Sequence, residues 1–272
     1  MVEITKKEFV AKIAVSFFVL MTIWWVWIFT SGARETQQNY LFGALYGLMA
    51  LWGGAWGIVI ARKWGSFSST IGTSIIVLSL GLLAQEFGQL VFSYYNIFLG
   101  IEIPYPSIAD AGFFGSILLY IYGIFLLARA SGIKFSLNTL VNQVQVVLIP
   151  LVILALSYSM FIRGYELDYS DPLRIFFDFG YPLGEAAYIS LAILTYSLSR
   201  NLLGGIMRNK ILFIVVAFIM QYIAEFNFLF QSSRGTWING GYGDYLYLFA
   251  YFVMTLGLIR FKTTADDLER SA

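Results

Sequence analysis

The feature that most constrains this chain is a succession of apolar segments, each about 20 residues long, separated by short polar stretches. A helix of that length spans the hydrocarbon core of a bilayer. Backbone groups in lipid must find hydrogen-bond partners within their own segment, so each segment is predicted to be a helix. The segments cover residues 13–30, 41–61, 71–98, 111–128, 139–161, 173–198, 211–230 and 245–261. We therefore expect an all-α membrane bundle of eight spans.

The composition agrees with this interpretation. Hydrophobic residues make up 59% of the chain and charged residues only 12%, whereas soluble domains are about 25% charged. The first segment follows three lysines, as a signal peptide would, but it is long and rich in Trp, so we interpret it as a retained span. We expect one membrane domain over residues 1–272, with a short cytoplasmic tail at 262–272.

The basic residues indicate the orientation. They gather before the first segment and after the second, fourth, sixth and eighth, while the alternate loops are acidic or mixed. By the positive-inside rule, both termini are predicted to lie in the cytoplasm of a cell-membrane protein. The residues concerned are Lys6, Lys7, Lys12, Arg62, Lys63, Arg129, Lys134, Arg200, Arg208, Lys210, Arg260, Lys262 and Arg270.

The absence of Cys and His limits the available chemistry. Without them an iron–sulfur cluster is excluded, and a zinc site or a haem is not expected. No Lys lies in the middle of a span, which argues against a retinal Schiff base. The net charge of +1 gives no reason to expect nucleic acid as a partner. Carboxylates, amides, tyrosines and backbone groups remain as functional groups, and no particular cofactor is indicated.

Three aspartates lie near the starts of apolar segments: Asp110, Asp178 and Asp244. An acid in the first turn of a helix interacts favourably with the helix dipole, and Ser107 is placed to cap the segment that contains Asp110. Asp110 alone is therefore interpreted mainly as a helix start. As one of three outer aspartates above deeper glutamates, it is also predicted to frame the mouth of a cavity.

The segment that contains Asp178 has a different start. Asp171 followed by Pro172 is a typical helix beginning, which leaves Asp178 nearly two turns inside. Arg174 can pair with it at i,i+4 spacing. Pro182 cannot donate a hydrogen bond to the Asp178 carbonyl, so we expect the helix to be kinked or opened there.

Three glutamates lie deeper in their segments, where a charge costs roughly 2.5–3.5 kcal/mol on insertion scales. No Lys or Arg lies at a comparable depth. The carboxyls are therefore either protonated, or hydrogen-bonded to amides and tyrosines as contacts between helices, or exposed to a wet cavity that binds a cation or polar ligand. With their polar neighbours, the candidate ligand-binding residues are Glu86, Gln89, Asp110, Asp178, Tyr181, Glu185, Gln221, Glu225 and Asp244.

A weak internal repeat is also present. Residues 82–95 can be aligned with 222–233, which superposes Glu86 on Glu225, and an aspartate follows each, Asp110 and Asp244. Such repeats often frame a site. The alignment predicts three hairpins that meet through their outer ends, unless aromatic-rich helices align by chance.

The phrase PYPSIADAGFFGSILLYIYGIFLLA, residues 104–128, resembles a motif of eight-span sensory modules found ahead of signalling domains in prokaryotic histidine kinases and diguanylate cyclases. In those modules a Pro-Ser-x-Ala-Asp phrase opens a span, and later spans begin with Asp. The resemblance covers about residues 80–260 and implies a stimulus-sensing membrane domain. By motif it assigns roles to Pro106, Ser107, Asp110, Asp178 and Asp244. No effector domain follows residue 261, so a sensor of this kind needs a separate cytoplasmic partner.

Several functions are compatible with these features. The favoured interpretation is a receptor-like sensor that binds a small or amphipathic ligand in an outward-facing cavity and signals through a partner. The alternatives are a transporter of small molecules or cations coupled to protons, and a structural subunit of a membrane complex. An enzyme that uses carboxylates, with Mg²⁺, Ca²⁺ or Mn²⁺ as an oxygen-liganded metal, is the least favoured.

Overall fold

The computed structural model describes residues 9–32, 34–130, 140–159, 169–198, 208–232 and 234–271, and within these ranges it contains helices and no strand. The longer helices are α2 (Phe9–Ser31), α3 (Gln37–Leu45), α4 (Leu48–Ala61), α5 (Thr70–Ser93), α6 (Ile108–Ala130), α7 (Leu140–Ser157), α8 (Pro172–Leu198), α9 (Arg208–Ser232) and α10 (Tyr242–Ser271). Two short 3₁₀ turns, Arg62–Trp64 and Ser66–Ser68, follow α4, and a π-helical segment, Tyr94–Leu99, extends α5.

Each predicted apolar segment corresponds to a helix, and the second corresponds to the pair α3 and α4. Six helical stretches in the described part of the chain are long and apolar enough to cross a membrane: Phe9–Ser31, Gln37–Trp64, Thr70–Leu99, Ile108–Ala130, Lys210–Gln231 and Tyr242–Lys262. The apolar part of α7, Gln143–Ser157, is shorter, and α8 is not among the six. The chain is thus an all-helical, multi-pass membrane protein.

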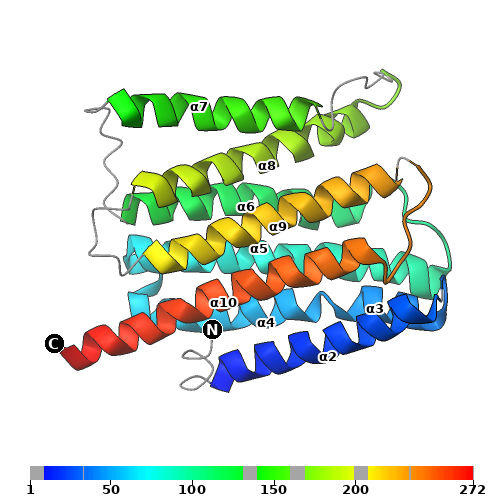
Figure 1. Ribbon diagram of the computed structural model, residues 1–272, viewed down its shortest axis with the longest axis horizontal. Coiled ribbons are helices and arrows are strands. Elements are labelled where there is room, and N and C mark those ends of the chain that lie inside the picture. The colour runs from blue at the N-terminus through cyan, green and yellow to red at the C-terminus, as the bar shows by residue number, and fades with distance from the viewer. Residues whose placement is uncertain are drawn as a thin grey trace.

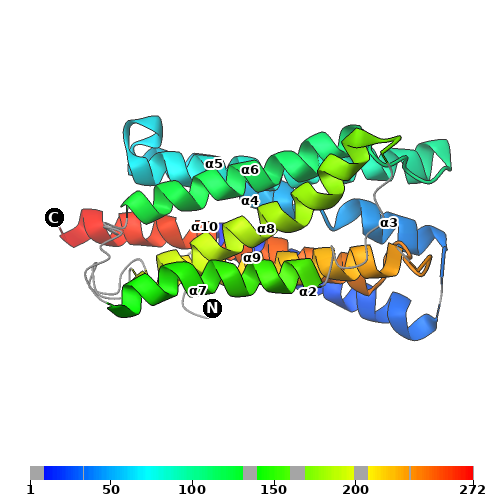
Figure 2. The same ribbon diagram turned by 90° about the horizontal axis from the view of Figure 1, so that it is seen from above.

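The helices lie side by side along the long axis of the molecule (Figures 1 and 2). The neighbours α5–α6, α7–α8 and α9–α10 form three hairpins, and α10 also packs against α4 and α2. The helix α7 lies at one edge of the bundle against α8 (Figure 1). Residues 100–107 and 234–241 connect helices at the end remote from the C-terminus, which we call the cavity end (Figure 1).

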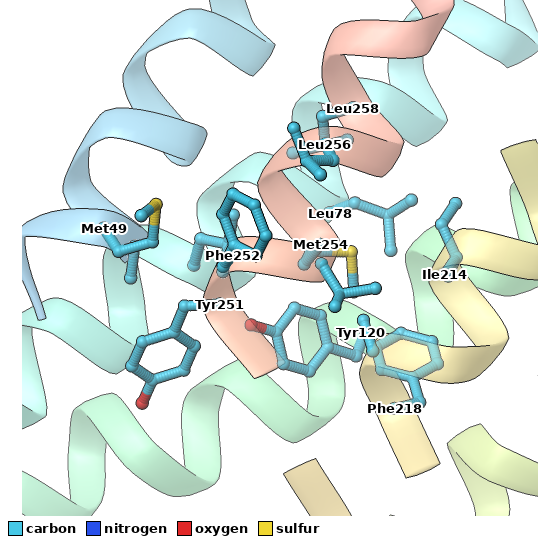
Figure 3. Packing of buried hydrophobic residues seen from close by; sticks show 14 of the residues in the cluster. Met49, Leu78, Tyr120, Ile214, Phe218, Tyr251, Phe252, Met254, Leu256 and Leu258 are labelled. Carbon is cyan, nitrogen blue, oxygen red and sulfur yellow. The ribbon is translucent and has the colours of Figure 1, made fainter. Parts of the chain in front are cut away.

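The part of the core in Figure 3 lies between α4, α5, α6, α9 and α10, and residues of α2 and α8 also belong to the core. Phe218 of α9 packs against two tyrosines, with ring centroids 5.1 Å from Tyr120 and 4.6 Å from Tyr188. The helices α5 and α6 approach closely at Gly81, where the absence of a side chain makes room for Tyr120. A Cβ atom at Gly81 would overlap the ring of Tyr120. Small residues allow close packing of this kind where lipid supplies no hydrophobic driving force between helices.

The structure bears on local expectations for α8 and α10. The Asp171 side chain caps α8 as predicted, since it accepts a 3.0 Å hydrogen bond from the Arg174 backbone amide. However, α8 is continuous from Pro172 to Leu198, so the helix is not opened at Pro182. Residues 262–271 are helical, because α10 continues through them to Ser271, and their place in the cytoplasm stays a prediction.

Candidate functional site

A cavity of about 1220 Å³ lies at the cavity end of the bundle. Helices α3, α5, α6, α8, α9 and α10 contribute to it, together with the connection at 100–107. Its acidic lining residues are Glu35, Glu102, Asp110, Asp178, Glu225 and Asp244. Six of the predicted site residues line it: Gln89, Asp110, Asp178, Tyr181, Glu225 and Asp244.

Asp110 has two structural roles at the cavity wall. Its Oδ2 accepts a 2.7 Å hydrogen bond from the Ser107 backbone amide, and the Ser107 hydroxyl accepts one from the Ala109 amide at 3.2 Å. These two bonds satisfy backbone amides that would otherwise lack partners at the start of α6. The other carboxylate oxygen, Oδ1, accepts a 2.7 Å bond from the Tyr181 hydroxyl of α8. Asp110 is therefore both the predicted helix start and a part of the cavity wall.

Asp178 lies nearer to solvent. Its Oδ1 accepts a 2.8 Å hydrogen bond from the Tyr105 hydroxyl, and its Oδ2 lies 3.8 Å from Arg174 Nε. The predicted pair with Arg174 is thus confirmed. Burial and the hydrogen bond to Asp178 raise the pKa of the Tyr105 hydroxyl, so this group stays neutral and donates at physiological pH. Arg174 is the only basic side chain among the described residues that line the cavity.

Asp244 is held by the turn before α10. Its Oδ2 accepts a 2.6 Å hydrogen bond from the Gly240 backbone amide. Gly240 has a φ of 65°, in the left-handed region, and a Cβ atom there would lie 2.9 Å from Asn39 Cα of α3. Glycine is therefore required by both the backbone conformation and the close approach. This turn brings the Asp244 carboxylate, which is 2% exposed, to the cavity wall.

Glu225 lies on α9, the other helix of the α9–α10 hairpin, and also lines the cavity. Its Oε2 accepts a hydrogen bond from the Tyr247 hydroxyl of α10. Glu225 is the deep glutamate that the structure places in the lining.

Two glutamines of α5 hold tyrosines at the floor of the cavity. Gln89 Oε1 accepts a 2.8 Å hydrogen bond from Tyr46, while its Nε2 donates to the Gly43 carbonyl at 2.7 Å. Gln85 Oε1 accepts a 2.9 Å bond from Tyr251, while its Nε2 donates to the Ser116 hydroxyl at 2.7 Å. We call Tyr46, Tyr247 and Tyr251 the tyrosine floor. The ring centroid of Tyr46 lies 6.3 Å from that of Tyr247 and 6.1 Å from that of Tyr251.

The other predicted site residues, Glu86, Glu185 and Gln221, do not line the cavity. Glu86 is 2% exposed, and its Oε2 lies against Gly47 without a hydrogen-bond partner. Glu185 is also 2% exposed, and it accepts a 3.2 Å hydrogen bond from Tyr188 through Oε1, while its Oε2 has no partner. Both glutamates therefore lie behind the cavity wall, and direct contact of a ligand with them stays a prediction.

Sequence reasoning did not include Tyr46, Gln85, Tyr105, Trp237 and Tyr251, which also line the cavity. A signal existed for some of them. Tyr46 and Tyr251 lie within apolar segments, away from the interfaces where membrane tyrosines usually gather. A buried Tyr hydroxyl usually has a hydrogen-bond partner, so these positions indicated polar neighbours.

The lining defines the chemistry that the cavity can accommodate. Carboxylates outnumber the single guanidinium, and aromatic rings form much of the remaining wall, including Phe92, Phe113, Phe177, Phe226 and Phe228. Carboxylates and aromatic faces both attract cations. Within the described ranges, no group of three or more acidic residues is arranged to hold a metal ion. A lining of carboxylates and aromatic rings is suited to a cationic ligand.

Comparisons of the chain with family models, with curated proteins and with solved structures find no match. Functional inference consequently rests on the geometry and charge of the cavity. The resemblance of residues 104–128 to a sensory module remains a prediction.

Proposed function

We propose that this protein is a membrane sensor that binds a small organic cation with an apolar body in the cavity and signals through a separate cytoplasmic partner. In this proposal α7 and α8 complete a set of eight spans. Both termini lie in the cytoplasm of a cell-membrane protein, so that the cavity opens to the outside. The end of α4, the end of α6 and the start of α9, which carry several of the basic residues that favour this orientation, lie at the end of the bundle opposite to the cavity (Figure 1).

The observation that carries the proposal is the combination of carboxylates and aromatic rings around one cavity of about 1220 Å³. Volumes of this order accommodate small organic ligands. A cation over an aromatic face gains about 0.5–2 kcal/mol, depending on its desolvation. An anion would instead meet the carboxylates of Asp110, Glu225 and Asp244, which repel it.

The helix α10 supports a role in signalling. It begins beside Asp244 at the cavity wall and continues without interruption to Ser271 at the opposite end (Figure 1). It packs against α9, α4 and α2 along the way. A shift of α10 on ligand binding would be transmitted to residues 262–271, where a cytoplasmic partner would detect it.

A pair of oppositely charged probes of similar size tests the proposal. The purified protein in detergent is titrated with 2-phenylethylammonium and with 3-phenylpropionate, and binding is measured by isothermal calorimetry and thermal unfolding. We expect the cation to bind and the Glu225→Gln variant to bind it more weakly. Binding of the anion with equal or greater affinity would contradict the proposal. Binding of neither probe would also contradict it and would favour an assembly subunit.

A transporter is the second candidate, and one observation favours it. Glu185 lies behind the cavity wall with an oxygen that has no hydrogen-bond partner, and it interacts electrostatically with Glu225 in the lining. Buried carboxylates in series are typical of proton-coupled carriers. Uptake of radiolabelled 2-phenylethylammonium into proteoliposomes with an imposed pH gradient distinguishes the two functions. A sensor gives no uptake beyond that of protein-free liposomes under the same gradient, whereas a carrier exceeds that baseline and loses the excess in Glu185→Gln.

A further inference from the structure

The hydrogen bonds at the cavity floor have a fixed direction that restricts which cations fit. A tyrosine hydroxyl has one proton to donate and lone pairs that accept. In the tyrosine floor, Tyr46 donates to Gln89, Tyr251 donates to Gln85, and Tyr247 donates to Glu225. All three protons are therefore used within the protein.

The two glutamines set this direction independently of any charge. The Nε2 of Gln89 donates to the Gly43 carbonyl, which can only accept, so its Oε1 must face Tyr46. The Nε2 of Gln85 donates to Ser116, whose own hydroxyl proton goes to the Phe113 carbonyl at 2.7 Å. Gln85 Oε1 therefore faces Tyr251. Reversing the direction of either series of hydrogen bonds would remove the side-chain donor from the Gly43 or the Phe113 carbonyl, and a hydrogen bond of this kind contributes about 0.5–1.5 kcal/mol.

The tyrosines of the outer cavity wall also donate their hydroxyl protons to groups of the protein. Tyr181 donates to Asp110, and Tyr105 donates to Asp178, so these hydroxyl protons are also engaged. The carboxylates carry only acceptor sites when ionised. The tyrosines of these bonds thus have no proton left to donate, while their oxygens and the carboxylates of Asp110 and Glu225 keep lone pairs. The lining also holds donors, the Nε1–H of Trp237, which has no hydrogen-bond partner, and the guanidinium of Arg174.

From this polarity we infer that the cavity selects ligands with N–H donors on the cationic nitrogen, a primary or secondary ammonium attached to an aromatic or apolar body. A quaternary ammonium satisfies the charge and the aromatic faces but has no proton for the free lone pairs. The inference rests on the proposed binding of organic cations and specifies their chemical class. Cation–π attraction is available to both kinds of cation, so the N–H groups alone produce the difference.

The test compares two probes that differ only by N-methylation, 2-phenylethylammonium and (2-phenylethyl)trimethylammonium. Their dissociation constants are measured by isothermal calorimetry on the full-length protein in detergent. Hydrogen bonds that involve a charged group are worth enough for a preference of roughly tenfold or more for the primary ammonium. Equal affinities, or tighter binding of the quaternary probe, would overturn the inference and leave the proposed function intact. Binding of neither probe would overturn both.

A variant tests whether the hydroxyl direction causes the preference. Gln85→Met keeps an unbranched side chain but removes the acceptor of the Tyr251 proton, which then becomes free to point into the cavity. The ratio of the two dissociation constants should fall toward one. Gln38→Met is the matched control, because Gln38 lies outside the lining and accepts only a bond from Trp24 among those described. An unchanged ratio in Gln85→Met would contradict the mechanism, and the wild-type ratio decides the inference if this variant does not fold.

Discussion

The hydroxyl of Tyr181 donates a 2.7 Å hydrogen bond to Oδ1 of Asp110, and this bond connects α8 to the N-terminal turn of α6. Both side chains are buried, at 8% and 5% exposure. The same carboxylate caps α6 through the Ser107 amide. One aspartate therefore secures a helix start and a contact between two helices at the cavity wall.

Replacement of Tyr181 by Phe should destabilise the protein by about 1–3 kcal/mol, because Asp110 Oδ1 loses its donor while the carboxylate stays buried. Thermal and denaturant unfolding in detergent would measure this loss. Tyr122→Phe is the control, because Tyr122 lies on α6 and is 51% exposed. The free energy of unfolding of this variant should lie within about 0.5 kcal/mol of the wild-type value. A similar loss in both variants would show that the bond to Asp110 contributes nothing specific.

The contact between Gly47 and Glu86 makes a second prediction. A Cβ atom at Gly47 would overlap Glu86 Oε2, so Gly47→Ala must displace a buried carboxylate. Overpacking of this kind costs about 1–3 kcal/mol. The double variant Gly47→Ala with Glu86→Ala should be destabilised by less than the sum of the two single changes, because the truncated side chain leaves space for the new methyl group.

Denaturant unfolding of the four proteins in this double-mutant cycle measures the coupling. Gly115→Ala is the control for the glycine change, because a Cβ atom there has no neighbour within 4 Å. Strict additivity in the cycle would mean that the carboxylate moves away from Gly47 without cost.

The helices and several of their starts were predictable from the sequence because their signals are local. Asp171 followed by Pro172 begins α8, and Ser107 with Asp110 begins α6, as the capping patterns indicated. The pair Arg174–Asp178 follows from the helical repeat alone. These interactions join residues within about one turn, so a single sequence contains the information.

The set of residues that line the cavity was only partly predictable, because it depends on contacts between distant segments. Glu86 and Glu225 occupy equivalent places in the weak repeat, yet Glu225 lines the cavity and Glu86 packs against Gly47 behind it. The pairs Tyr46–Gln89 and Tyr251–Gln85 join residues 43 and 166 positions apart. Such pairs require knowledge of which helices are neighbours, which periodicity does not provide.

The different positions of Glu225 and Glu185 make a third prediction. Glu225→Gln should weaken binding of 2-phenylethylammonium by roughly tenfold or more, because it removes a charge that faces the ligand. Glu185→Gln should change the affinity by less than about threefold, because Glu185 lies behind the wall and so does not face the ligand. Calorimetric titration of each variant at one pH and ionic strength would compare them. A larger effect of Glu185→Gln would place the ligand deeper than the cavity.

The last prediction concerns Arg174, whose side chain is 56% exposed at the rim. Its ion pair with Asp178 is largely solvated, so Arg174→Gln should lower stability by less than about 1 kcal/mol. The same change removes the basic side chain from a lining rich in carboxylates, and the affinity for 2-phenylethylammonium should rise by roughly twofold to fivefold at low salt. Because the rim charge is exposed, the gain should shrink as ionic strength increases. Arg62→Gln, at the opposite end of the bundle, removes the same net charge and should leave the affinity unchanged; an equal gain in that variant would show that overall charge, and not the rim of the cavity, governs binding.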